Sequence, residues 1–169
     1  MKLIRVLVSS CLMGNSVRYD GGDQFCDNLS NLLFNDSRII CYAFCPEVSG
    51  GLSVPRSRAA INRNYSGYDV LNHDKAKVIN SDGIDVTNEY IKGAQLALEF
   101  CKKNRISIAI MKEDSPSCGS NTLFNPTFDA SKKIGPGVTA ALLKKNNIAV
   151  FSEIEVEELS KYIKSIFNE

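Results

Sequence analysis

Residues 106–120, ISIAIMKEDSPSCGS, contain the pattern from which the organisation of this chain can be inferred. An apolar run rich in β-branched residues, 106–111, is followed at once by Asp, Ser, Pro and Gly. This pattern predicts a buried strand that leads into a loop. The loop contains the thiol of Cys118, several hydroxyls and Gly119, which lets the backbone come close to a ligand.

The same arrangement occurs twice earlier in the chain. Residues 3–8 form an apolar run that ends in Ser9-Ser10-Cys11, and residues 39–44 form another that ends in Cys45-Pro46-Glu47. In an open α/β sheet, ligands bind beyond the carboxyl ends of the strands. We therefore expect Cys11, Cys45 and Cys118 to meet at that edge.

A fourth strand is predicted over 148–151, and helices are predicted between the strands. They are expected over 23–34, from Asp85 or Thr87 to Asn104, after Gly137, and after the capping-box spacing of 152–155. This alternation predicts one α/β domain over 1–169, with a Rossmann-like, mainly parallel sheet flanked by helices and the site at the carboxyl edge of its strands.

Two stretches carry weaker signals. Residues 48–74 show little periodicity, so we expect a long connection without regular structure, of the kind that often serves function. Residues 123–133 are expected to be irregular or to form a small hairpin.

Composition sets limits on partners and compartment. The 169 residues are 44% hydrophobic and 23% charged, with a formal net charge of +1, which gives no electrostatic signature for nucleic acid or a membrane surface. The first residues lack the uninterrupted apolar stretch that a signal peptide needs, and no apolar run reaches the ~20 residues of a membrane span. We expect a cytoplasmic protein, whose six cysteines serve metal binding, catalysis or burial rather than disulfides.

The six cysteines fall into two groups. Cys26, Cys41 and Cys101 lie inside predicted helices or strands and are expected to be small buried hydrophobes. The three strand-end thiols would repel one another as thiolates and would need a cation, and soft sulfur favours zinc, Cu(I) or an iron–sulfur cluster. Three ligands to a [4Fe–4S] cluster leave one iron open to substrate, while zinc with three cysteines and a water is the other option.

Five motifs, in this order, resemble one family over nearly the whole chain. They are Ser9-Ser10-Cys11-Leu12-Met13-Gly14, Cys45-Pro46-Glu47-Val48-Ser49-Gly50-Gly51-Leu52 with Pro55-Arg56, Asp82-Gly83-Ile84-Asp85-Val86-Thr87, Lys112-Glu113-Asp114-Ser115-Pro116-Ser117-Cys118-Gly119-Ser120 and Gly137-Val138-Thr139-Ala140-Ala141-Leu142-Leu143. The family is DUF523, which includes the thiouracil desulfidases.

The resemblance implies a [4Fe–4S] enzyme that turns 2- or 4-thiouracil into uracil and sulfide by non-redox Lewis-acid chemistry at an open cluster iron. It assigns the three cluster ligands to Cys11, Cys45 and Cys118. It also assigns the catalytic carboxylate to Glu47 and the catalytic serine to Ser115 or Ser117. The implied partner is a small thiolated nucleobase, with no nucleic acid polymer and no membrane.

Other functions stay open on the sequence alone. They are a non-catalytic iron–sulfur sensor or sulfur carrier, and a zinc-dependent hydrolase or an enzyme with one activated thiol. The single histidine, His73, lies in an irregular polar region, which argues against a Ser–His or Cys–His nucleophile. Gly135-Pro136-Gly137 has two interpretations, an anion site at a helix start or a plain helix-entry turn, and the pattern favours the turn.

Overall fold

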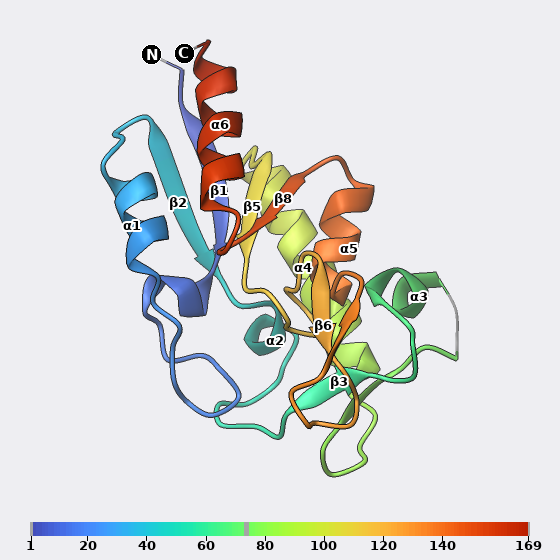
Figure 1. The fold of residues 1–169 in the computed structure, drawn as a ribbon. Helices are drawn as coiled ribbons and strands as arrows, with labels where there is room; N and C mark the ends of the chain where they lie inside the picture. The colour runs from blue at the N-terminus through green and yellow to red at the C-terminus, as the bar shows by residue number, and fades with distance from the viewer. Residues whose placement is uncertain (1, 73–74, 169) are drawn as a thin grey trace.

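Four parallel strands form the centre of the molecule in the computed structural model, which describes residues 2–72 and 75–168. Their order across the sheet is β2-β1-β5-β8 (Figure 1). The register pairs Ile4 with Ile39 and Val6 with Ile108, so β1 lies at the centre between two parallel neighbours. The strands are β1 (Ile4–Ser9), β2 (Ile39–Phe44), β5 (Ile108–Met111) and β8 (Ala149–Ser152). The predicted parallel α/β sheet is confirmed.

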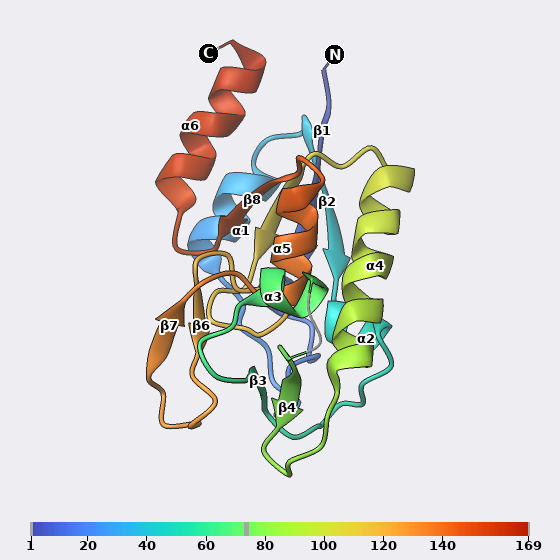
Figure 2. The same cartoon turned by 90° about the vertical axis from the view of Figure 1, so that its right-hand side faces the viewer.

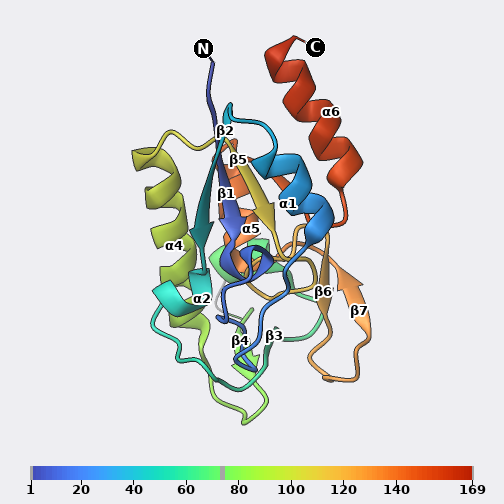
Figure 3. The ribbon, with the colours of Figure 1, turned by 90° about the vertical axis from the view of Figure 1, so that its left-hand side faces the viewer.

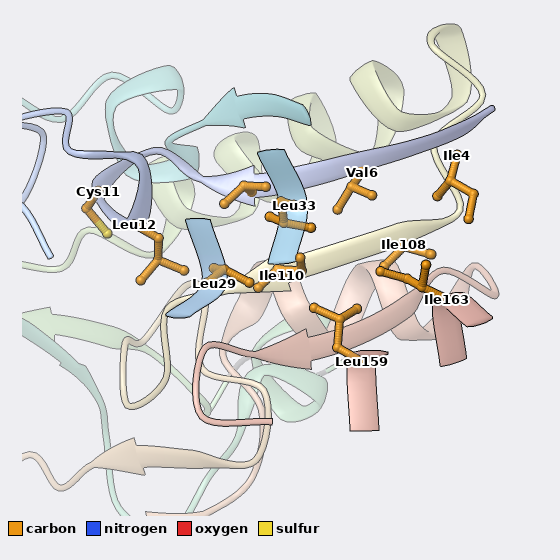
Figure 4. Packing of buried hydrophobic residues seen from close by; sticks show 11 residues of the cluster. Ile4, Val6, Cys11, Leu12, Leu29, Leu33, Ile108, Ile110, Leu159 and Ile163 are labelled. Atoms are coloured by element: carbon orange, nitrogen blue, oxygen red, sulfur yellow. The ribbon is translucent and has the colours of Figure 1, made fainter. Parts of the chain in front are cut away.

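One face of the sheet is covered by α1 (Asp27–Phe34) and α6 (Val156–Phe167). Because side chains alternate along a strand, every second residue of β1 points to this face. Figure 4 shows the resulting cluster, in which β1 and β5 residues pack against leucines of α1 and the apolar stripe of α6. Its central members are Ile4, Val6, Leu29, Leu33, Ile108, Ile110, Leu159 and Ile163.

The opposite face is covered by α4 (Thr87–Lys103) and α5 (Val138–Lys145), as Figures 2 and 3 show. Leu7, the β1 residue between the two that face α1 and α6, packs here with Cys101 of α4 and Leu143 of α5. Helix α4 starts at Thr87 and is followed by Asn104, as its sequence predicts.

Smaller elements lie beyond the carboxyl ends of the central strands, while both chain ends lie at the opposite end (Figures 1 and 2). An antiparallel pair and a hairpin pack there with α3 around a second core that includes Ile61, Tyr90 and Leu123. These elements are β3 (Ala59–Ile61), α3 (Gly67–Asn72), β4 (Val78–Asn80), β6 (Thr122–Phe124) and β7 (Lys132–Ile134). The small hairpin, one of two options from the sequence, is what forms.

Two local expectations were wrong. Residues 48–74 are not without regular structure, because β3 and α3 form there through contacts with distant parts of the chain. Helix α1 begins at Asp27 rather than Asp23, so Phe25 lies before the helix, with 51% of its surface exposed. The Asp23 carboxylate accepts the Phe25 N–H at 2.9 Å, which favours a turn over a helix at this point.

The capping box expected at 152–155 forms only in part. The Glu155 carboxylate accepts the Ser152 N–H at 2.7 Å, as a capping box requires. Ser152, however, is still the last residue of β8, and α6 begins at Val156. The pairing of Ser152 with Met111 in the sheet keeps it out of the helix.

Two glycines let a short helix, α2 (Pro46–Ser49), pack closely against α4 (Figure 3). A Cβ on Gly93 of α4 would lie 2.1 Å from the Pro46 carbonyl oxygen, and a Cβ on Gly50 would lie 2.1 Å from the Glu89 carbonyl oxygen. Any side chain at either position would push the two helices apart. This contact brings Glu47, on α2, close to the first turns of α4.

No helix within the described ranges is both long enough and apolar enough to cross a membrane.

Candidate active site

The three strand-end cysteines line a single cavity of about 340 Å³. Cys11 lies in η1 (Ser10–Met13), directly after β1, and Cys45 precedes α2, directly after β2. Cys118 lies in the loop that follows β5. The structure thus brings together the three thiols that the sequence places at three separate strand ends, because parallel strands deliver their carboxyl ends to one edge.

Burial makes these thiols hard to ionise. It raises the pKa of Cys11 to about 11, with the neighbouring Cys45 adding to the effect, and it raises the pKa of Cys45 and of Cys118 as well. Soft sulfur donors around such a cavity suit a cationic iron–sulfur or similar thiophilic centre, which stabilises the thiolate forms. Among residues 2–72 and 75–168, no three His, Cys, Asp or Glu side chains are gathered closely enough to hold one metal ion.

The other three cysteines were expected to be small buried hydrophobes, and Cys101 meets this expectation more fully than Cys26 and Cys41. Cys101 is fully buried against Leu7 and Leu143, and burial raises its pKa to about 12. Cys26 and Cys41 are partly buried and pack against the cluster under α1 and α6. None of the three lines the cavity that the described residues form.

Glu47 is held by side chains on both of its carboxylate oxygens. Arg56 Nε and Nη2 lie 2.8 Å and 2.6 Å from Oε2, and Ser117 Oγ donates to Oε1 at 2.9 Å. Ser115 Oγ is farther from Oε1, at 3.4 Å. Tyr90, from the first turn of α4, also hydrogen-bonds to Glu47; burial, and then this negative charge, raise the pKa of Tyr90 well above its usual value.

The two serines differ in what they contact. Ser115 Oγ accepts the N–H groups of Ser117 and Cys118 at 3.2 and 3.1 Å, so its proton is left for Ser117 Oγ, at 3.1 Å, or Glu47. Ser117 is 1% exposed, whereas Ser115 is partly exposed in the cavity wall. Ser117 Oγ also lies 3.4 Å from Cys118 Sγ, so its one proton serves either Glu47 or the thiol.

The loop with both serines is held by the start of α5. Val138 N–H donates to the Pro116 carbonyl at 2.9 Å, and the N–H groups of Thr139 and Ala140 donate to the Ser117 carbonyl at 2.9 and 3.1 Å. The first-turn N–H groups of this helix are therefore already used inside the chain. Of the two options for 135–137, the structure supports the helix-entry turn.

Several cavity residues were not identified from the sequence as functional. Arg56 occurs in the sequence analysis only inside a motif, and no local signal singles out Tyr90. Aromatic side chains of the β6–β7 hairpin, Phe124 and Phe128, also line the cavity. Nothing in the local pattern marks them, because the packing of the hairpin over the strand ends is a long-range effect. His73 lies outside the described residues.

This fold and site define a known class of proteins. The family model described as 2-thiouracil desulfurase matches residues 6–155, so the chain belongs to this family. The predicted family and the predicted enzyme class, a thiouracil desulfidase, are confirmed.

Two individual proteins are similar over nearly their whole length. The protein YbbK of Bacillus subtilis (strain 168) is 42% identical over 154 residues, which cover 91% of this chain and 99% of YbbK. A solved structure described as the [4Fe-4S]-dependent thiouracil desulfidase TudS is 38% identical, with a TM-score of 0.80 over 97% of this chain and 99% of that chain.

Proposed function

We propose that this chain is a [4Fe–4S]-dependent desulfidase that converts a small thiolated pyrimidine, such as 2- or 4-thiouracil, into uracil and sulfide. The observation that carries the proposal is that one cavity is lined by Cys11, Cys45 and Cys118 together with Glu47 and Ser115. Membership of the 2-thiouracil desulfurase family and the similarity to TudS support it.

Cys11, Cys45 and Cys118 are the residues that would hold the cluster. They fit it chemically, since iron–sulfur clusters are bound by thiolates and these three thiols line one cavity of about 340 Å³. When bound through three protein ligands, the cluster supplies an open iron, a soft Lewis acid for a thiocarbonyl sulfur.

Glu47 and the serines provide the proton chemistry. Both serines line the cavity, and Ser115, the more exposed of the two, connects through Ser117 to Glu47 Oε1. Glu47 accepts a proton from the attacking water through this chain and returns a proton to the product. Water adds its oxygen to the ring carbon, the sulfur leaves as sulfide, and no net electrons are transferred.

Part of the cavity wall is aromatic and suits a flat ring. Tyr19, Phe44, Phe124 and Phe128 line the cavity. Aromatic faces offset-stack with a pyrimidine, and stacking of a base on an aromatic side chain contributes about 1–3 kcal/mol. A free thiolated base therefore has both a polar edge, at the serines, and an apolar wall to bind against.

The test is anaerobic purification and reconstitution, followed by measurement of iron, acid-labile sulfide and uracil release from thiouracil. We expect a brown protein with iron and sulfide bound, which releases many uracils per cluster. A colourless protein that is active with zinc alone would support a zinc hydrolase. Uptake of one sulfur per cluster without turnover would support a sensor or carrier, and either result would contradict the proposal.

A further inference from the structure

We propose that Arg56 is a positioning residue for Glu47, and that it affects the reaction only through this carboxylate. The proposal rests on the proposed function, in which Glu47 moves protons. It concerns the orientation of the carboxylate: which oxygen faces the serines, and how firmly it is kept there.

Arg56 contacts Glu47 through two nitrogens, and both nitrogens contact the same carboxylate oxygen. Arg56 Nε and Nη2 both lie against Glu47 Oε2, at 2.8 and 2.6 Å. Oε1 is left to the serines, with Ser117 Oγ at 2.9 Å and Ser115 Oγ at 3.4 Å. The guanidinium group thus occupies Oε2 and leaves Oε1 to the two serine hydroxyls.

Arg56 is also fixed from behind by main-chain groups. Its Nη1 donates to the Ser53 carbonyl at 3.1 Å, and its Nη2 donates to the Val17 carbonyl at 3.0 Å. Its own N–H donates to the Tyr19 carbonyl at 2.8 Å. These bonds join the loop after η1 to the segment after α2, so the guanidinium cannot turn without breaking contacts to both.

The pair is mostly shielded from water. The side chains of Arg56 and Glu47 are 9% and 13% exposed. Removing one partner of a buried pair leaves the other charge without compensation, so the remaining group moves or takes up water. A lysine could keep the charge, but it cannot present two fixed N–H donors to one oxygen.

The consequence is a prediction about rate rather than affinity. A displacement of about 1 Å in a reacting group can cost about 10²-fold in rate. If Arg56 holds Glu47 in the reactive orientation, its loss should lower kcat and leave KM nearly unchanged. A second substitution at Glu47 should then make the loss of Arg56 irrelevant.

The experiment is a double-mutant cycle on the reconstituted holoenzyme, with Arg56→Met, Glu47→Gln and the double variant. We expect Arg56→Met to lower kcat roughly 10²-fold with full iron content, and to cause no further loss in the Glu47→Gln background. Arg56→Lys, which preserves the charge and protects folding, should recover part of kcat. The control is Arg38→Met, since Arg38 also pairs with a carboxylate, Asp36, but outside the cavity.

The possible failures are separable. Losses that multiply in the double variant, or a rise in KM that accounts for the Arg56→Met effect, would show that Arg56 acts on substrate and would overturn the proposal. Iron loss in both Arg56→Met and Arg56→Lys would make it a scaffold residue and would also overturn it. Full kcat in Glu47→Gln would instead contradict the role of Glu47 in the proposed function.

Discussion

The two ends of the central sheet both contain an arginine–carboxylate pair, but they use it differently. At the amino end, Arg38 and Asp36 lie 2.7 Å apart and are 30% and 26% exposed. At the carboxyl end, Arg56 and Glu47 lie 2.6 Å apart and are 9% and 13% exposed. The Arg38 bonds lower the pKa of Asp36 to about 2.

The difference shows what burial adds. Asp36 and Arg38 are two positions apart, so their pairing is local and their charges remain in contact with water, where such pairs contribute little to stability. Glu47 and Arg56 meet between a helix and an irregular segment and share serine and tyrosine partners. At this end, both oxygens of the mostly buried Glu47 carboxylate have partners beside a cavity, an arrangement that suits proton transfer.

The largest expected effect comes from two thiols in the same apolar cluster, Cys118 and Cys101. Cys118→Ser should abolish cluster binding, because a hydroxyl is a poor replacement for a thiolate ligand to iron. Cys101→Ala should keep full iron content and lose only about 1 kcal/mol of stability from the small cavity it creates. Iron and acid-labile sulfide per chain, together with thermal unfolding, measure both.

Cys11→Ser and Cys45→Ser should behave like Cys118→Ser, and Cys26→Ala and Cys41→Ala like Cys101→Ala. Loss of the cluster in any variant of the second group would break the division between cavity thiols and core thiols.

The sheet could be predicted from sequence because its signals are local. Each central strand is an apolar run that ends at turn residues, and α4 shows its buried face at three- and four-residue steps. The elements that were missed, β3 and α3, are short and are stabilised by residues far away in the chain. The start of α1 was misplaced because the Asp23 carboxylate accepts the Phe25 N–H, which favours a turn before the helix.

Part of the candidate site could likewise be predicted from local features of the sequence. Strand ends are local features, so Cys11, Cys45 and Cys118 could be placed together before the structure was known. The contacts of Arg56 and Tyr90 with Glu47 could not, because they depend on how closely α2 packs against α4 and on the path of the chain after it. Local patterns identify chemistry-bearing residues, whereas their orientation depends on tertiary contacts.

A smaller effect should separate the two serines of the buried network. Ser115→Ala removes the hydroxyl of the more exposed serine in the cavity wall, and loss of one donor that contacts the reacting group typically lowers kcat about 10²–10³-fold. Ser117→Ala should cost only about tenfold, roughly one hydrogen bond, because Ser115 Oγ is already 3.4 Å from Glu47 Oε1 and can bond it directly. Steady-state kinetics at matched iron content compare them, and a greater loss in Ser117→Ala would reverse the assignment.

The smallest effect concerns stability at the carboxyl end, in a group outside the proton network. Lys133 Nζ, on β7, donates to the Ile61 and Arg63 carbonyls at 2.7 Å each, and burial lowers its pKa from 10.5 to about 8. Between these two values the unfolded chain binds the proton and the folded chain does not, so stability rises with pH. The contribution is complete above 10.5 and is lost as the pH falls through 8.

We therefore compare the Tm of the wild type with that of Lys133→Met from pH 7 to 10, because other titrations cancel in the difference. The Tm of the wild type should rise relative to that of the variant as the pH rises, by no more than roughly 2–4 °C. The effect is small because the Lys133 side chain is only half buried and partly screened by water. Asp36→Asn is the matched control at the amino end. The pKa of Asp36, about 2, lies far below this range, so its Tm difference should stay flat. If the Tm difference for Lys133→Met also stays constant with pH, the ammonium group of Lys133 is solvated. Buried charge would then distinguish the two ends of the sheet only at the cavity residues.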